Sequence, residues 1–194
     1  IGPRAGYYPT RKLQHLVEQI ADQDPVLLRA EMLLRDLRER FDQSVSLARI
    51  TGEQAVYLLS LEPSHPLRFH VRVGDQVRSL YATSAGKAIL GSLEPAQLQS
   101  VVGRLVLTPF TPQTLTSREA VIADVEEGRQ RGWYINREES VPTATTLSAP
   151  FTWNRSVFII TMAGPTFMIE PRIDAISEAL LETCRRLESP GGPT

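Results

Sequence analysis

The chain has 194 residues, of which 42% are hydrophobic and 22% charged, a balance typical of a folded globular domain and not of a disordered segment. The formal net charge is −1 and the basic residues are spread along the chain, so no basic patch predicts nucleic-acid binding by this segment. A single cysteine, Cys184, excludes an internal disulfide and a cysteine-rich metal site. With one thiol, no signal-peptide pattern and no apolar run of transmembrane length, we expect a cytoplasmic protein.

The start of the chain predicts a segment that leads into the domain. Residues 1–9 are rich in glycine and proline and do not begin with methionine, so we expect the chain to start inside a longer protein. Residues 10–21 predict a short helix that must pack against something, because apolar positions recur at helical spacing at Leu13, Leu16, Val17 and Ile20. Asp24-Pro25 then starts a second amphipathic helix, which continues to Phe41.

The rest of the chain predicts an α/β (α+β) fold whose mixed, largely antiparallel sheet is flanked by helices. The run 54–62 is apolar on both faces, which predicts a central strand, and 67–73 alternates, which predicts a half-buried strand. The other expected strands cover 43–50, 133–137, 144–151 and 157–163, and the other expected helices begin at Ser84, Glu94, Thr116 and Pro171. A parallel βαβ array would alternate strands and helices more regularly.

The stretch 79–93, SLYATSAGKAILGSL, is the strongest candidate for a ligand contact. An apolar strand end leads into a helix for which Ser84 is the expected N-cap, with Gly86 in the first turn. The first backbone N–H groups of such a helix have no partner within it and form a cradle for a carboxylate or carbonyl oxygen. The pattern is not a phosphate-binding loop, and an ordinary capped helix whose glycine packs closely on a sheet remains the alternative explanation.

No residue pattern indicates a metal site or a cofactor. The histidines have no partner at metal-ligand spacing, so we expect a solvated or capping role for His15, His65 and His70. Glu138 and Glu139 are adjacent in an expected strand end, where neighbours point to opposite faces, so we expect solvated charges and not a general acid–base pair.

The candidate nucleophiles do not indicate an enzyme either. Ser148 precedes Ala149-Pro150, which is not the turn of a hydrolase nucleophile elbow. Cys184 falls on the apolar stripe of the last helix, where it is expected to pack in the core. A small hydrolase that uses Ser148 or Glu138 stays open as an alternative, although no base, nucleophile and orienting group occur together.

Four segments together resemble the effector-binding domain of the isocitrate-lyase-regulator (IclR) type of transcription factors. They are ATSAGKAILGSL, RGWYINREE, TLSAPF and a strand that ends in Gly164-Pro165 before a closing helix, and they occur in the order of the family. The resemblance implies a GAF-like, profilin-like domain over 23–188. The residues that follow, SPGGPT over 189–194, predict a disordered tail. GYYPTRKLQHL resembles the end of the family's wing and its linker helix, which implies that 1–22 is this segment and that the winged helix-turn-helix is absent.

The resemblance further implies a small organic effector, operator DNA bound only through the absent domain, and a homodimer or tetramer. Its pocket positions carry over to the backbone amides of Ser84, Ala85 and Gly86 and to the side chains of Asn136, Thr146, Thr161 and Ala163, with Leu80 as an apolar wall and Tyr134 on the strand face of Asn136. No charged side chain is expected inside, so we expect a neutral or singly anionic ligand of modest size with an apolar portion. A GAF-like input module of another signalling protein is the alternative.

Overall fold

The computed structural model describes residues 25–189, so the helix expected over 10–21, His15 and nearly all of the expected tail lie outside the described residues. Its strands are β1 (Ser44–Thr51), β2 (Gln54–Leu61), β3 (Tyr134–Arg137), β4 (Ala144–Trp153) and β5 (Ser156–Pro165). Its helices are α2 (Pro25–Phe41), α3 (Ser84–Gly91), α4 (Pro95–Arg104), α5 (Arg118–Arg131), α6 (Thr166–Ile169), the 3₁₀ helix η1 (Glu170–Arg172) and α7 (Ile173–Glu188).

The five strands form one sheet in the order β2-β1-β5-β4-β3, and every neighbouring pair is antiparallel. The long hairpin of β4 and β5 turns through Asn154 and Arg155, both with a left-handed backbone. The predicted sheet flanked by helices is therefore confirmed, and in the described part of the chain it is wholly antiparallel.

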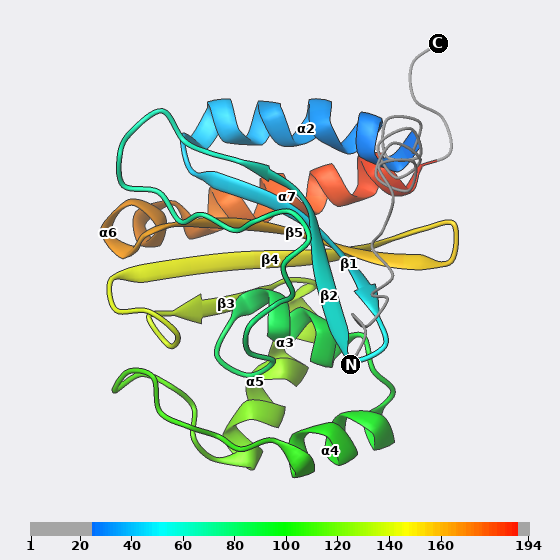
Figure 1. Ribbon diagram of the computed structural model, residues 1–194, viewed down its shortest axis with the longest axis vertical. Helices are drawn as coiled ribbons and strands as arrows, with labels where there is room; N and C mark the ends of the chain where they lie inside the picture. Colours follow the sequence, from blue (N-terminus) through cyan, green and yellow to red (C-terminus); the bar gives the residue numbers. More distant parts are fainter. Residues whose placement is uncertain (1–24, 190–194) are drawn as a thin grey trace, which may run out of the picture.

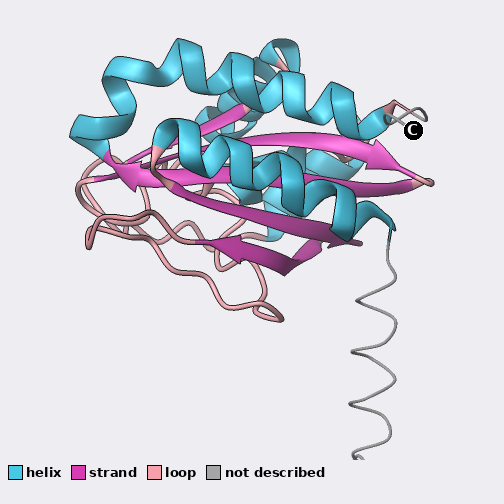
Figure 2. Ribbon diagram, turned by 90° about the horizontal axis from the view of Figure 1, so that it is seen from above, coloured by secondary structure: helices cyan, strands magenta, loops and turns pink. Residues whose placement is uncertain are grey.

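The helices divide between the two faces of the sheet. α2 and α7 lie side by side across one face, while α3, α4 and α5 cover part of the other (Figure 1, Figure 2). Strand alternation sends Leu47, Leu147 and Ile160 to the α2/α7 side and Ala48 and Ile159 to the other. Two separate apolar cores therefore hold the sheet, and part of the second face is left without a helix.

Long-range contacts of arginine fix α2 against α7. The Arg29 guanidinium on α2 donates to the carbonyls of Arg186 and Ser189 at the end of α7 and lies over the ring of Trp153. The carbonyls at a helix C-terminus lack partners within the helix and carry the negative end of its dipole, so a cation there is stabilising. The apolar stripe of α2, predicted from its spacing, is buried at Val26, Ala30, Leu33, Leu34, Leu37 and Phe41.

Two strand predictions are wrong. Residues 67–73 belong to a long loop over 62–83 and not to a strand, because no neighbouring strand pairs with their backbone. The alternation of the sequence does not appear as alternating burial, since Leu67 and Val73 are exposed. β2 is not central but lies at an edge. It is nevertheless apolar on both faces, because Leu59 packs on the α2/α7 core, Tyr57 packs on the α3 side, and residues 74–77 bond to its open edge.

Two helix starts are shifted by one residue. The N-cap of α3 is Thr83 and not Ser84, since the Thr83 side chain accepts a hydrogen bond from the Gly86 amide. The N-cap of α5 is Ser117 and not Thr116, and Ser117 accepts from the amide of Ala120. In both cases two adjacent hydroxyl residues fit the same cap pattern, so the pattern alone does not choose between them.

Candidate functional site

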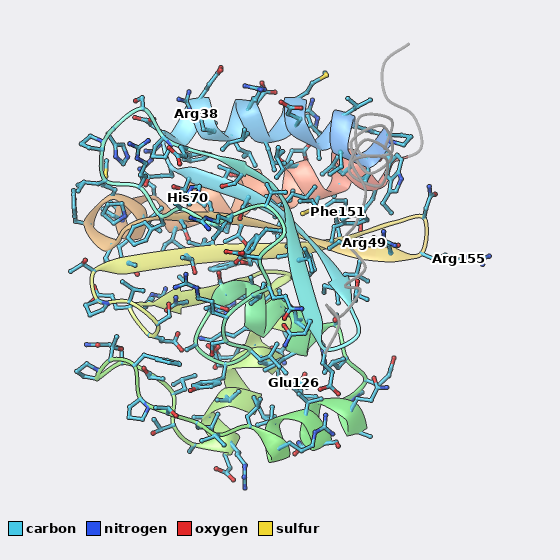
Figure 3. All side chains as sticks on the ribbon, in the orientation of Figure 1. Arg38, Arg49, His70, Glu126, Phe151 and Arg155 are labelled. Atoms are coloured by element: carbon cyan, nitrogen blue, oxygen red, sulfur yellow. The ribbon has the colours of Figure 1, made fainter. Side chains whose placement is uncertain are left out.

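A cavity of about 460 Å³ lies between the sheet and the loop 62–83. Its floor is the part of the second sheet face that α3, α4 and α5 leave uncovered, and its roof is the loop. The N-terminus of α3 and the turn between β3 and β4 close it laterally. Figure 3 shows the side chains that project from these elements, with His70 labelled on the loop.

Two rows of residues, in register across neighbouring strands, form this part of the sheet, and all of them except Ser148 line the cavity. One row consists of Ser44, Ala163, Thr146 and Asn136, from β1, β5, β4 and β3. The next row consists of Ser60, Ser46, Thr161 and Ser148, from β2, β1, β5 and β4. All but two of these residues carry a hydroxyl, so the floor is polar although the opposite face of the same strands is apolar.

A chain of hydrogen-bonded hydroxyls joins the floor to α3. The Ser84 Oγ lies 2.6 Å from Thr146 Oγ1 and 2.8 Å from Ser148 Oγ. The Ser148 Oγ lies in turn 2.7 Å from Thr161 Oγ1. The side chains of Ser84 and Ser148 are fully buried. Thr146, Thr161 and Ser84 belong to the lining of the cavity, and Ser148 does not. The first residue of α3 is therefore held on the sheet by side-chain hydroxyls at the cavity wall.

The N-terminus of α3 presents two backbone amides at this wall. The amide of Gly86 is used by the Thr83 cap, at 3.0 Å, and Thr83 also donates to the Ser79 carbonyl. The amides of Ser84 and Ala85 come before the first intrahelical bond, and within residues 25–189 neither has a hydrogen-bond partner. Both residues line the cavity, so these donors and the positive end of the helix dipole face it.

Gly86 has a packing role at the same helix start. A Cβ on this residue would lie 2.0 Å from the Ser79 carbonyl oxygen and 2.6 Å from the Leu80 Cα, so only glycine allows the approach. This contact holds the 79–83 turn against α3. Gly86 is thus closely packed, but against the 79–83 turn and not against the sheet. The amide donors that remain for a ligand are those of Ser84 and Ala85.

The loop roof brings charged residues to the cavity, so the expectation that none lies inside is wrong. Arg72, Arg78 and Asp75 line it together with His70. In the described part of the chain, the guanidinium groups of Arg72 and Arg78 make no ion pair or hydrogen bond. With Asp75, the cavity lining therefore has two cations and one anion without a side-chain partner among the described residues, and this excess of positive charge favours an anion.

Local polar contacts fold the roof in place. The Glu62 carboxylate accepts from Arg68 and His70, and the arginine hydrogen bond is the largest cause that lowers the pKa of Glu62. Between these two residues the Phe69 amide donates to the Ser44 hydroxyl on the floor, at 3.2 Å. His70 therefore binds a carboxylate of its own loop and is more than half exposed, which agrees with the solvated alternative expected for it and not with a cap.

Asn136 both lines the cavity and holds the turn after β3. Its Oδ1 accepts from the Glu139 amide at 2.7 Å, and its Nδ2 donates to the Ser140 Oγ at 2.9 Å. The residue is 1% exposed, so it is buried although β3 is an edge strand of the sheet. Asn136→Ala should therefore weaken this turn as well as the cavity wall, because the substitution removes two hydrogen bonds of the turn.

Behind this turn lies a buried ion cluster that the sequence analysis missed. The Lys87 Nζ lies 2.6 Å from Glu139 Oε1 and 2.8 Å from Asp124 Oδ2, and donates to the Ile135 carbonyl at 2.9 Å. Lys87 is 1% exposed, and burial raises the pKa of the Glu139 carboxyl above its ordinary value against the opposing effect of Lys87. Glu139 is thus not the solvated charge that was expected. The one signal in the sequence was a lysine inside an otherwise apolar helix run.

Comparison with known proteins places this fold in a family. The family model described as the C-terminal domain of the bacterial transcriptional regulator IclR matches residues 18–188. The chain belongs to the IclR family. The regulator BhcR of Paracoccus denitrificans is 30% identical over 162 residues, which are 82% of this chain and 58% of that protein. The probable transcriptional regulator SauR of Cupriavidus necator is 33% identical over 124 residues, 64% of this chain and 49% of that protein.

Solved structures agree with this IclR assignment. The crystal structure of the Thermotoga maritima IclR superposes with a TM-score of 0.76 at 25% identity, over 94% of this chain and 76% of that chain. The chain spans about half the length of BhcR and SauR, and these relatives are named as transcriptional regulators. It therefore corresponds to the C-terminal domain of an IclR-type regulator.

Most of the pocket positions carried over from the IclR family meet at the cavity. The cavity lining includes Ser84, Ala85, Asn136, Thr146, Thr161 and Ala163. It does not include Gly86, Leu80 or Tyr134. Tyr134 shares the strand face of Asn136, as predicted, but its ring fills the space beside Gly91 and Gly128, where a Cβ would lie 1.7 Å and 2.3 Å from tyrosine atoms.

The candidate nucleophiles and histidines of the IclR-type domain can now be placed. Ser148 has only hydroxyl partners, and Cys184 is buried with a pKa raised to about 12 by burial. His65 contacts the Asp42 carbonyl. Among residues 25–189 no group of three histidine, cysteine or acidic residues could hold a metal ion, and no helix is long and apolar enough to cross a membrane.

Proposed function

We propose that this chain is the ligand-sensing and oligomerising part of an IclR-type transcriptional regulator. In this proposal the domain spans residues 23–188, the cavity binds a small organic effector, and its occupancy controls DNA binding by a winged helix-turn-helix elsewhere in the protein. Residues 1–22 would be the end of the wing and the linker helix. The family match and the regulators that the chain resembles support the regulatory role.

The cavity is the observation that carries the proposal. Its size of about 460 Å³ suits a small molecule, and it combines fixed amide donors from Ser84 and Ala85 with a hydroxyl floor. Arg72 and Arg78 add positive charge without a protein partner. An organic anion therefore fits better than a neutral molecule, which sharpens the ligand expected from the sequence, and the polar floor leaves less room for an apolar portion.

Ligand retention and cavity blocking test this function. Native mass spectrometry of the protein purified from its source should show a retained small molecule, and a thermal-shift screen of organic acids should find one that stabilises the chain. Ala163→Leu, on the cavity floor, should abolish both responses, whereas Ala175→Leu, on the exposed side of α7, should leave them unchanged. A stabilising acid whose effect survives Ala163→Leu would show that the ligand binds elsewhere.

Assembly is the second part of the proposal. The apolar stripe expected over 10–21 needs a surface to cover it, so the chain should be at least a dimer. Multi-angle light scattering at about 10–50 μM, a range set by typical weak association, would measure this. A purely monomeric species would remove oligomerisation from the proposed function but would leave ligand binding untouched.

A further inference from the structure

The hydroxyl chain between α3 and the cavity floor has one more proton than its internal hydrogen bonds use. Four hydroxyls, those of Thr146, Ser84, Ser148 and Thr161, are joined by three hydrogen bonds. Each hydroxyl has one proton to donate, so three of the four protons are used inside the chain and one is left. Ser84 and Ser148 are fully buried and have no other side-chain partner, so the remaining proton belongs to one of the two ends.

Thr146 and Thr161, the two ends of this hydroxyl chain, both line the cavity. Whether one of them donates or accepts determines what the other does. If the Thr146 hydroxyl donates into the cavity, then Ser84 donates to Thr146 and Ser148 donates to Ser84. Thr161 must then donate to Ser148, and it offers the cavity only a lone pair. The cavity therefore presents one hydroxyl donor and one hydroxyl acceptor, and a ligand that fixes the first also fixes the second.

The surroundings decide which end donates. Thr146 is bonded to the first residue of α3, beside the two free amides and the positive end of the helix dipole, so a ligand oxygen that is negatively charged belongs there. Such an oxygen draws the proton of Thr146. Thr161 is then an acceptor and needs a donor on the ligand.

An unpartnered hydroxyl lies beside Thr161. Ser46 pairs with Thr161 across β1 and β5, is 7% exposed, lines the cavity, and makes no side-chain hydrogen bond within the described residues. A ligand hydroxyl at this point can donate to Thr161 and accept from Ser46. A methyl group would leave both unpaired, and a second carboxylate would face the lone pair of Thr161.

We propose that this hydroxyl chain makes the cavity select a small hydroxycarboxylate, with the carboxylate at the N-terminus of α3 and a hydroxyl over Thr161 and Ser46. The inference rests on the proposed function, since it assumes that the cavity binds the effector. Thr146 and Thr161 are diagonal neighbours on one sheet face, roughly 7–8 Å apart. The carboxylate and the hydroxyl are therefore several bonds apart on the ligand.

Three six-carbon acids test the selection by calorimetric titration of the whole chain. Gluconate carries hydroxyls along its length, hexanoate carries none, and adipate ends in a second carboxylate. Gluconate should bind at least about tenfold more tightly than either, the ratio expected for one unpaired buried polar group. Hexanoate or adipate binding as tightly as gluconate would overturn the inference and leave the proposed function standing. Gluconate failing to bind while the screen finds an acid without hydroxyls would do the same.

Variants test whether the four hydroxyls act as a coupled chain or only as separate contacts to the ligand. Thr161→Val should remove the preference for gluconate over hexanoate. Ser148→Ala touches no ligand, but it frees the proton of Thr161, so adipate should gain relative to gluconate by about tenfold. Thr145→Val, a buried hydroxyl on the opposite face of β4, is the matched control and should change no ratio. Ratios in Ser148→Ala equal to those of the parent would overturn the coupling; a cavity that binds no acid in any assay would overturn the proposed function as well.

Discussion

Replacing Lys87 by methionine should destabilise the domain strongly. The substitution keeps the length of the side chain but removes the cation that lies 2.6 Å from Glu139 and 2.8 Å from Asp124. Removal of one partner from a buried ion pair typically costs about 3–5 kcal/mol, because the remaining charge stays buried without compensation. The lost bond to the Ile135 carbonyl adds to this cost.

The free energy of unfolding is measurable by urea denaturation, with the fluorescence of Trp133 and Trp153 as the signal. Arg104→Met is the matched control, since Arg104 pairs with Glu53 on the surface, where both side chains are more than half exposed, and such pairs contribute about 0–1 kcal/mol. A loss below about 1 kcal/mol for Lys87→Met would refute the view that the cluster is desolvated.

The pH dependence gives an independent check on the same cluster. The pKa of Glu139 is raised in the folded protein, chiefly by burial, so the folded state holds this proton more tightly than the unfolded chain. For a carboxyl group whose pKa is raised by folding, the free energy of unfolding falls as pH rises from the pKa of the unfolded chain, near 4.5, through the pKa of the folded state. Without Lys87 the folded pKa should rise further, so the deficit of Lys87→Met should shrink as pH is lowered from 7 towards 5. A deficit independent of pH would mean that Glu139 is already neutral.

Gly91→Ala should lower the free energy of unfolding by about 1–3 kcal/mol, because the new Cβ would lie 1.7 Å from the Tyr134 hydroxyl. Gly103→Ala, with open space around it, should be neutral or slightly stabilising, and thermal denaturation of both variants compares them. The thiol of Cys184 is buried and its pKa is raised to about 12, so at pH 8 a disulfide reagent should label the native chain far more slowly than the chain in urea, and equal rates would contradict the burial. The isolated chain should show no sequence-specific shift of operator DNA in a gel assay, because its net charge is −1 and its basic residues are spread along the sequence; a salt-resistant, specific shift would disprove this.

Local pattern determined most of the secondary structure. The apolar spacing between Pro25 and Phe41 predicted α2 within a residue, and the alternating or apolar runs predicted all five strands with small errors at their ends. These signals depend on side chains three or four positions apart in a helix, or two apart in a strand, so neighbouring residues suffice to reveal them. Such signals leave errors of about one residue, as at α3, where Ser84 was expected as the N-cap and Thr83 is the N-cap.

Pairing and burial could not be derived in this way. The sequence does not show that β2 lies at an edge, nor that 67–73 covers the sheet as a loop, because both depend on which distant strand is available for hydrogen bonding. Glu139 was expected to be solvated for the same reason. Its partner Lys87 lies 52 positions away, and only the folded chain brings the two charges together.

The residues of the candidate site were likewise indicated in part by the sequence and in part only by the structure. The sequence, through its resemblance to the IclR family, indicated the start of α3 and the positions Asn136, Thr146 and Thr161, which the structure gathers at one cavity. Only the tertiary structure decided that Arg72 and Arg78 line the same cavity. It also decided that Ser84 bonds to Thr146, a residue 62 positions away. Hydrogen bonds of this kind follow from the register of paired strands and from the docking of a helix on a sheet, which no short stretch of sequence specifies.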